Sequence, residues 1–258
     1  MCFDFDARPP ALPDDLRLAP IAGAANAEML ELNSVDGTHF SAALAQAAPG
    51  RRGGVVILPD VRGLYPFYIE LAERFAQAGY NAIALDYFGR TAGLGPRDAE
   101  FEYMPHVEQL TVPQVEEDAT AAVAELRERT EAGPVATVGF CLGGFLSFQA
   151  GADILELSAV IGFYGVLGRS RFGAQAPLER TREIRVPLLG LFGGADQAIP
   201  VEEVEQFDAR LGEADLDHEI HVYPGAPHSF FDRRYEEHAE ASNDAWRRML
   251  AFLERHVA

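Results

Sequence analysis

Short apolar runs alternate along this chain with longer stretches in which apolar residues recur at helical spacing. The segments that predict strands cover residues 55–58, 82–85, 134–138, 157–163, 187–192 and 218–223. Those that predict longer helices cover residues 66–79, 113–130, 201–211 and 236–256. Continuous apolar runs of strand length are typical of strands buried on both faces. The alternation therefore predicts an α/β fold, with right-handed βαβ units, a mainly parallel central sheet and helices on both faces.

The pattern differs before the first of these runs. Residues 28–33 and 39–45 flank the turn signal Asp36-Gly37, which predicts an N-terminal antiparallel hairpin. Residues 1–26 are rich in Pro, Ala and Asp and predict an extended N-terminal arm. Residues 27–258 then form a single domain, since a chain of 258 residues that is 48% hydrophobic can bury one sizeable core.

Charge and composition narrow the classes of function. A formal net charge of −19 disfavours nucleic acid and anionic membranes as partners. All 21 basic residues are arginines, which excludes Schiff-base and P-loop lysines. Cys2 and Cys141 are the two cysteines, too few for a disulfide framework or a zinc site. Without a signal-peptide pattern or an apolar run of roughly 18 residues, we expect a cytoplasmic protein.

Cys141 lies where a predicted strand turns directly into a predicted helix. The local sequence is Gly139-Phe140-Cys141-Leu142-Gly143-Gly144, the nucleophile-elbow pattern G-x-S-x-G with cysteine in place of serine. Helix N-terminal N–H groups would lower the pKa of the thiol and stabilise an oxyanion. The alternative is that Cys141 is a small buried apolar residue, which is common for cysteine.

Two further candidates follow the ends of later strands. Asp196 comes after residues 187–192 and His228 after residues 218–223. Separately, Asp196 fits a turn or helix cap and His228 a surface loop. Together with Cys141 they have the order nucleophile, acid, base of an α/β-hydrolase triad. The oxyanion hole would then use the backbone N–H groups of Leu142 and Val61.

At this point the chain resembles a known family. The sequence around Cys141, with Gly194-Ala195-Asp196 and Pro227-His228-Ser229-Phe230, is similar to the dienelactone hydrolase (carboxymethylenebutenolidase) family of α/β-hydrolases. The similarity covers roughly residues 27–256. It implies a Cys-His-Asp triad that cleaves a small ester or lactone through a thioester, no cofactor, no metal and a soluble cytoplasmic enzyme.

The resemblance also implies roles outside the triad. In the family a Glu after the first parallel strand interacts with the resting thiol, and Asp60 stands at this position, which makes it the candidate thiol-gating carboxylate. Family members bind a substrate carboxylate with arginines. Arg90 matches one of them approximately, whereas the other falls on Asp232, with Arg233 displaced by one place. The alternative for both arginines is surface charge paired with neighbouring acids.

Two other functions remain open from the sequence. A thiolate at Cys141 could serve a redox-sensitive protein, with Cys2 as the one possible resolving cysteine. The chain could also be a non-catalytic, ligand-binding α/β-hydrolase homologue, since a fold does not determine a function. Intact residues at all three triad positions favour the hydrolase.

Overall fold

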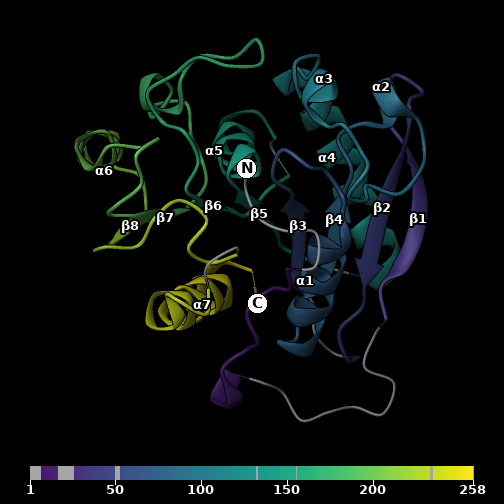
Figure 1. Ribbon diagram of the computed structural model, residues 1–258, viewed down its shortest axis with the longest axis horizontal. Coiled ribbons are helices and arrows are strands. Elements are labelled where there is room, and N and C mark those ends of the chain that lie inside the picture. Colours follow the sequence, from purple (N-terminus) through teal and green to yellow (C-terminus); the bar gives the residue numbers. More distant parts are fainter. Residues whose placement is uncertain are drawn as a thin grey trace.

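The computed structural model describes residues 7–16, 26–49, 53–131, 133–154, 156–232 and 235–257, and shows one eight-stranded sheet. The strand order is β1-β2-β4-β3-β5-β6-β7-β8 (Figure 1). The strands are β1 (Glu28–Asn33), β2 (His39–Ala45), β3 (Gly54–Leu58), β4 (Asn81–Leu85), β5 (Val135–Phe140), β6 (Ala159–Phe163), β7 (Leu188–Gly193) and β8 (His218–Tyr223). β1 and β2 pair antiparallel, as β2 and β4 do, and every pairing from β4 to β8 is parallel. The predicted sheet and hairpin are confirmed.

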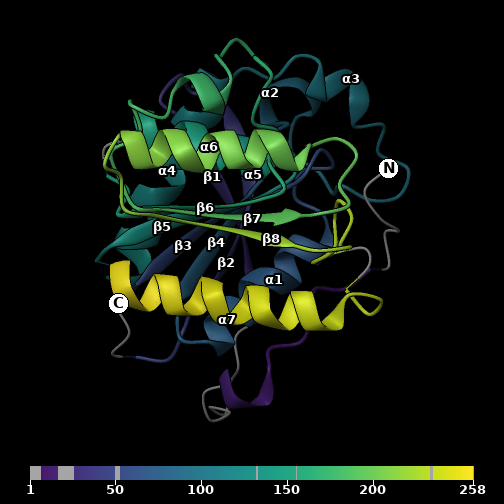
Figure 2. The same cartoon turned by 90° about the vertical axis from the view of Figure 1, so that its left-hand side faces the viewer.

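Helices cover both faces of this sheet. α1 (Pro66–Gln77) and α7 (Ala239–His256) lie on one face, and α4 (Val112–Thr130), α5 (Leu142–Asp153) and α6 (Val201–Glu213) lie on the other (Figure 2). Every residue of β3, β4, β5 and β6 is therefore buried, which explains why these strands are continuous apolar runs. Short helices α2 (Gly89–Ala92) and α3 (Met104–Val107) and the 3₁₀ turns η1 (Asp14–Leu16) and η2 (Pro177–Glu179) lie in the connections.

Part of the predicted N-terminal arm packs on α7. The indole Nε1 of Trp246 donates a hydrogen bond to the carbonyl oxygen of Pro10 at 3.3 Å, and Arg247 pairs with Asp15. Residues 1–6, with Cys2, and residues 17–25 lie outside the described residues. Across the ranges that the structure does describe, no helix combines the length and the apolar character needed to cross a membrane.

Two carboxyl groups interact between neighbouring helices, Glu116 on α4 and Asp153 at the end of α5. Arg180, just after η2, binds Asp153 through two hydrogen bonds of 2.7 and 2.8 Å. Oε1 of Glu116 is buried and has no hydrogen-bond partner among the described residues. Burial, and then the charge of Asp153, raise the pKa of Glu116 to about 8. Glu116 therefore retains its proton at neutral pH in the folded protein.

We expect Glu116→Gln to remove a pH-dependent loss of stability. The folded protein holds a proton on Glu116 up to about pH 8, whereas the ordinary pKa of a glutamate side chain is 4.5. An unfolded chain would release this proton first, so Glu116 contributes less stability as the pH rises through this window. In urea unfolding at about pH 5 and about pH 8.5, the free energy of unfolding of the variant should rise relative to that of the wild type at the higher pH.

Glu205→Gln is the matched control, because Glu205 is an exposed glutamate on α6 and should behave alike at both pH values. An equal effect of Glu116→Gln at the two pH values would contradict the protonated carboxyl.

Candidate active site

Cys141 lies at a strained turn between β5 and α5. Its backbone has φ 55° and ψ −107°, a conformation that L-residues other than Gly rarely adopt and that is concentrated at functional sites. Its N–H donates a hydrogen bond to the carbonyl oxygen of Phe163 at 3.0 Å, which ties the turn to the end of β6. The thiol is half-buried, in keeping with a reactive position at the first turn of a helix.

Glycines make this turn possible because the backbone of the first turn of α5 lies directly against the backbone of the sheet. A Cβ at Gly139 would lie 1.9 Å from the carbonyl oxygen of Gly143. A Cβ at Gly143 would lie 1.9 Å from the carbonyl oxygen of Leu58 and 2.5 Å from that of Pro59. The first turn of α5 thus touches the end of β3 and Pro59, which lies two residues before Val61.

Asp196 and His228 meet at the ends of the neighbouring strands β7 and β8. Nδ1 of His228 and Oδ2 of Asp196 are 2.6 Å apart, and the side chain of Asp196 is only 1% exposed. Oδ1 of Asp196 accepts the N–H of Ala198 at 2.8 Å. One oxygen of the carboxylate therefore stabilises the turn after β7, and the other binds the imidazole. Asp196 can thus be a turn residue and the acid of a triad at the same time. With Nδ1 engaged, Nε2 is left for proton transfer.

Tyr164 lies against His228 and is hydrogen-bonded to the buried Asp232. It follows β6 with φ 39°, and its ring centroid lies 4.9 Å from that of His228. Its hydroxyl donates a hydrogen bond to Oδ2 of Asp232 at 2.7 Å, and both residues are buried. Burial, followed by the charge of Asp232, raises the pKa of Tyr164 well above 10.0, so the phenol stays neutral.

Asp60 forms a buried ion pair with an arginine that sequence reasoning did not single out. Nη2 of Arg62 lies 3.0 Å from Oδ2 of Asp60, with the two side chains 3% and 0% exposed. The N–H of Arg62 also donates to Oδ1 of Asp60 at 2.9 Å. Burial raises the pKa of Asp60, and the charges of Arg62 and, more weakly, His228 oppose this rise. The charge of His228 therefore acts on Asp60, although more weakly than the charge of Arg62.

The predicted oxyanion donors have unused N–H groups. Among the residues that the structure describes, neither Val61 nor Leu142 donates a backbone hydrogen bond to another group. Leu142 is the first residue of α5, where N–H groups have no partner within the helix. Val61 is half-exposed. Both donors are therefore suited to an oxygen that develops negative charge near Cys141.

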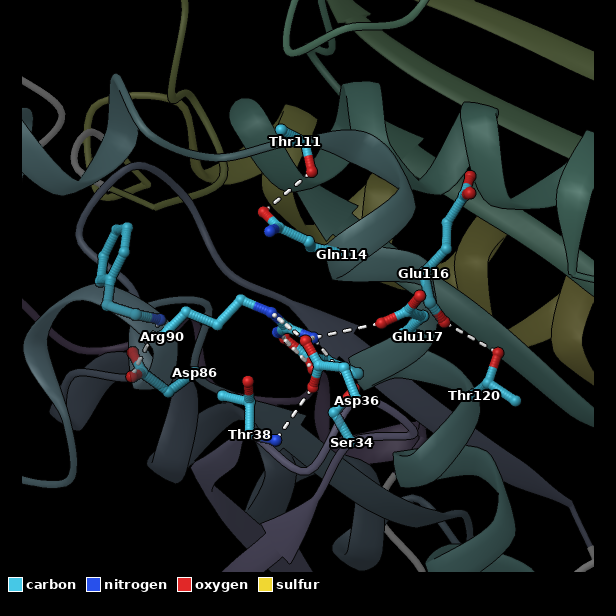
Figure 3. A network of polar contacts seen from close by, with 12 residues as sticks. Ser34, Asp36, Thr38, Asp86, Arg90, Thr111, Gln114, Glu116, Glu117 and Thr120 are labelled. Atoms are coloured by element: carbon cyan, nitrogen blue, oxygen red, sulfur yellow. Dashed lines mark hydrogen bonds and ion pairs between the residues drawn. The ribbon is translucent and has the colours of Figure 1, made fainter.

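Arg90 lies in a different setting from the one that the resemblance implied. Its guanidinium reaches between Asp36 and Glu117 (Figure 3) and donates to Oδ1 of Asp118 at 2.6 Å. These acids come from the β1–β2 turn and from α4, so the arginine joins the hairpin to a helix. Its substrate-binding role stays a prediction, and a ligand carboxylate would have to displace three protein carboxylates.

The position of the second arginine is only partly described. Arg233 lies outside the described residues, and Asp232 is a buried acid bound to Tyr164. Within the described ranges, no three His, Cys, Asp or Glu side chains gather in a way that could hold a metal ion.

Comparison with known proteins identifies relatives across most of the chain. The model of the dienelactone hydrolase family matches residues 40–257. A candidate carboxymethylenebutenolidase of Yersinia pestis is 32% identical over 209 residues, covering 78% of each chain. A candidate 2-oxo-3-(5-oxofuran-2-ylidene)propanoate lactonase of Bradyrhizobium is 27% identical over 89% of this chain and 96% of its own. The crystal structure of a candidate dienelactone hydrolase of Klebsiella pneumoniae superposes with a TM-score of 0.77 at 28% identity, covering 89% of this chain and 99% of the other.

We expect Gly143→Ala to destabilise the protein by about 2–4 kcal/mol, because the added methyl group would overlap backbone oxygens that cannot rotate away. Urea unfolding measures the loss. Gly212→Ala is the control, since Gly212 lies in α6 with its nearest contact at 3.9 Å and alanine there should gain up to about 1 kcal/mol. Equal effects of the two substitutions would contradict the close approach of α5 to β3.

Arg90→Met should lower stability by about 3 kcal/mol, because it leaves the buried Asp118 without its cation. The double variant Arg90→Met/Asp118→Asn should recover part of this loss, since it removes the unpaired charge. Unfolding by urea and binding of a small carboxylate ligand are measured side by side. A selective loss of carboxylate binding at unchanged stability would instead support the substrate-binding role.

Proposed function

This chain belongs to the dienelactone hydrolase family and is an ester or lactone hydrolase, and from that premise we propose that Cys141, His228 and Asp196 form its catalytic triad. The observation that carries the proposal is the 2.6 Å contact between His228 and Asp196, together with a cysteine at a strained elbow at the end of β5. The family relationship and the ends of three parallel strands support the same assignment.

The proposed reaction is acyl transfer through a thioester. Sγ of Cys141 attacks the carbonyl carbon as a thiolate, and His228 holds the thiol proton at Nε2. The backbone N–H groups of Val61 and Leu142 stabilise the resulting oxyanion. When the tetrahedral intermediate collapses, the carbon–oxygen bond breaks and His228 protonates the leaving alkoxide, which stays attached to the acyl group if the substrate is a lactone.

Hydrolysis of the thioester completes the cycle. His228 accepts a proton from water, the hydroxide adds to the acyl carbon, and the thiolate leaves. Asp196 holds the imidazole through Nδ1 and stabilises its charged form in both halves of the reaction. No cofactor is needed for these steps.

The substrate in this proposal is a small ester or lactone. An additional carboxylate on the substrate finds weak support in the arginines that the structure describes, because Arg90 is engaged by Asp118 and Arg62 by Asp60. Arg233 lies outside the described residues, so its contribution stays a prediction. Rates for a neutral lactone and for its carboxylate analogue would show which class is preferred.

Direct control of the thiol by Asp60 also remains a prediction. The carboxylate accepts hydrogen bonds from the side chain and the backbone of Arg62, so release toward Cys141 would require breaking a buried ion pair. The redox alternative would need a second cysteine near Cys141, and Cys141 is the one cysteine in the described part of the chain.

We expect Cys141→Ala and His228→Ala each to lower kcat/KM for 4-nitrophenyl acetate by about 10³-fold or more, because both residues act in one unit. The wild type should also show a covalent acetyl adduct on Cys141 by mass spectrometry when turnover is stopped early. His39→Ala is the control, since His39 lies on the exposed hairpin and binds Glu31. Full activity of His228→Ala would rule out the triad.

A further inference from the structure

We propose that the buried Asp60–Arg62 pair is a positioning device for the oxyanion hole, which fixes the backbone N–H of Val61 between the two paired residues. The inference rests on the proposed thioester mechanism, because it concerns the group that stabilises the oxyanion formed there. Asp60 and Arg62 are therefore positioning residues that act through Val61.

The contacts within the turn support this assignment. Arg62 returns to Asp60 with its side chain at 3.0 Å and with its backbone N–H at 2.9 Å. The N–H of Gly63 donates to the carbonyl oxygen of Asp60 at 3.1 Å. Val61 is therefore enclosed in a small closed ring of interactions, and neither of its peptide planes can rotate without breaking one of them.

Contacts from outside the turn fix its entry. The N–H of Asp60 donates to the hydroxyl of Tyr68 on α1 at 3.0 Å. The hydroxyl of Tyr87, which follows β4, donates to the carbonyl oxygen of Pro59 at 2.7 Å. Two buried phenols from different elements therefore hold the backbone just before Val61.

The exit of the turn is held in the same way. The N–H of Leu64 donates to Oδ1 of Asp86 at 3.2 Å, and Asp86 is itself bound by Arg97 at 2.8 Å. The guanidinium of Arg62 lies over the ring of Tyr65 at 4.3 Å and donates to its hydroxyl at 2.9 Å. The arginine is thus fixed in position as well as paired.

An ion pair serves this position better than an apolar contact for an electrostatic reason. Buried ion pairs seldom stabilise a fold more than apolar residues of the same volume, so stability alone does not account for one here. Asp60 alone would place an uncompensated negative charge beside the developing oxyanion. Arg62 neutralises it, and its planar fork fixes the carboxylate at the same time.

The experiment separates acylation of Cys141 from its intrinsic reactivity. In Asp60→Asn/Arg62→Met, both charges are removed together, so that no unpaired charge is left buried. We expect alkylation of Cys141 by iodoacetamide to stay within about twofold of the wild type, because Arg62 holds Asp60 within the turn and balances its charge. Burst-phase acylation by 4-nitrophenyl acetate should fall by about 10–100-fold, since a misplaced donor loses transition-state stabilisation.

Two results would overturn the inference. A parallel fall of alkylation and acylation would mean that Asp60 acts on the thiol itself, and unchanged acylation would mean that the pair is only structural. Should the double variant fail to fold, Arg62→Lys replaces it, because lysine keeps the charge and loses the fork. We expect it to show the same selective loss of acylation, to a smaller extent.

A control pair and the wild type complete the test. Asp153→Asn/Arg180→Met removes an ion pair near the far end of α5 and should leave both rates unchanged. Absence of acylation in the wild type, with normal alkylation, would refute the proposed thioester mechanism at Cys141 and is distinguishable from failure of the positioning role.

Discussion

The backbone contact between α5 and the end of β3 is the constraint on which the site depends. Side chains at Gly139 and Gly143 would overlap backbone oxygens, so the chain can pass from strand to helix only without them. This approach presents Cys141 at a positive φ of 55°. It also brings the first N–H groups of the helix next to the turn after β3. One steric condition thus positions both the proposed nucleophile and the proposed donors for its oxyanion.

Pairing of buried acids with arginine is the second organising feature. Asp60 pairs with Arg62, Asp86 with Arg97 and Asp118 with Arg90, and each of these carboxylates is almost fully buried. In a chain without lysine and with a net charge of −19, the planar guanidinium supplies the bidentate contacts that buried carboxylates need. Arginines near the strand ends are accordingly part of the framework, and their presence alone is weak evidence for an anionic substrate.

The sequence was sufficient to predict the sheet, because burial on both faces requires apolar runs such as β3 and β5. It also predicted Asp196 and His228 as partners, since both directly follow strands that prove to be adjacent. Arg90 shows the limit of this reasoning. The acids that engage it lie 54 and 28 residues away in the chain, and no local pattern reports such contacts. Arg62 was missed because its partner is two residues away in a turn whose shape the sequence does not specify.

The arrangement divides the site into two supporting units with Cys141 between them. In the proposed mechanism, His228 and Asp196 at the ends of β8 and β7 serve proton transfer, and the turn after β3 stabilises the negative charge on oxygen. Tyr164 contacts the proton-transfer unit and lies next to Cys141 in the fold. Its ring contacts His228, and it follows Phe163, whose carbonyl oxygen accepts the N–H of Cys141. Because separate strands carry the two units, a change in one can alter its step while the other keeps its geometry. Cysteine makes this separation observable, since the reactivity of a thiol toward an alkylating agent does not require an oxyanion hole, whereas formation of a thioester does.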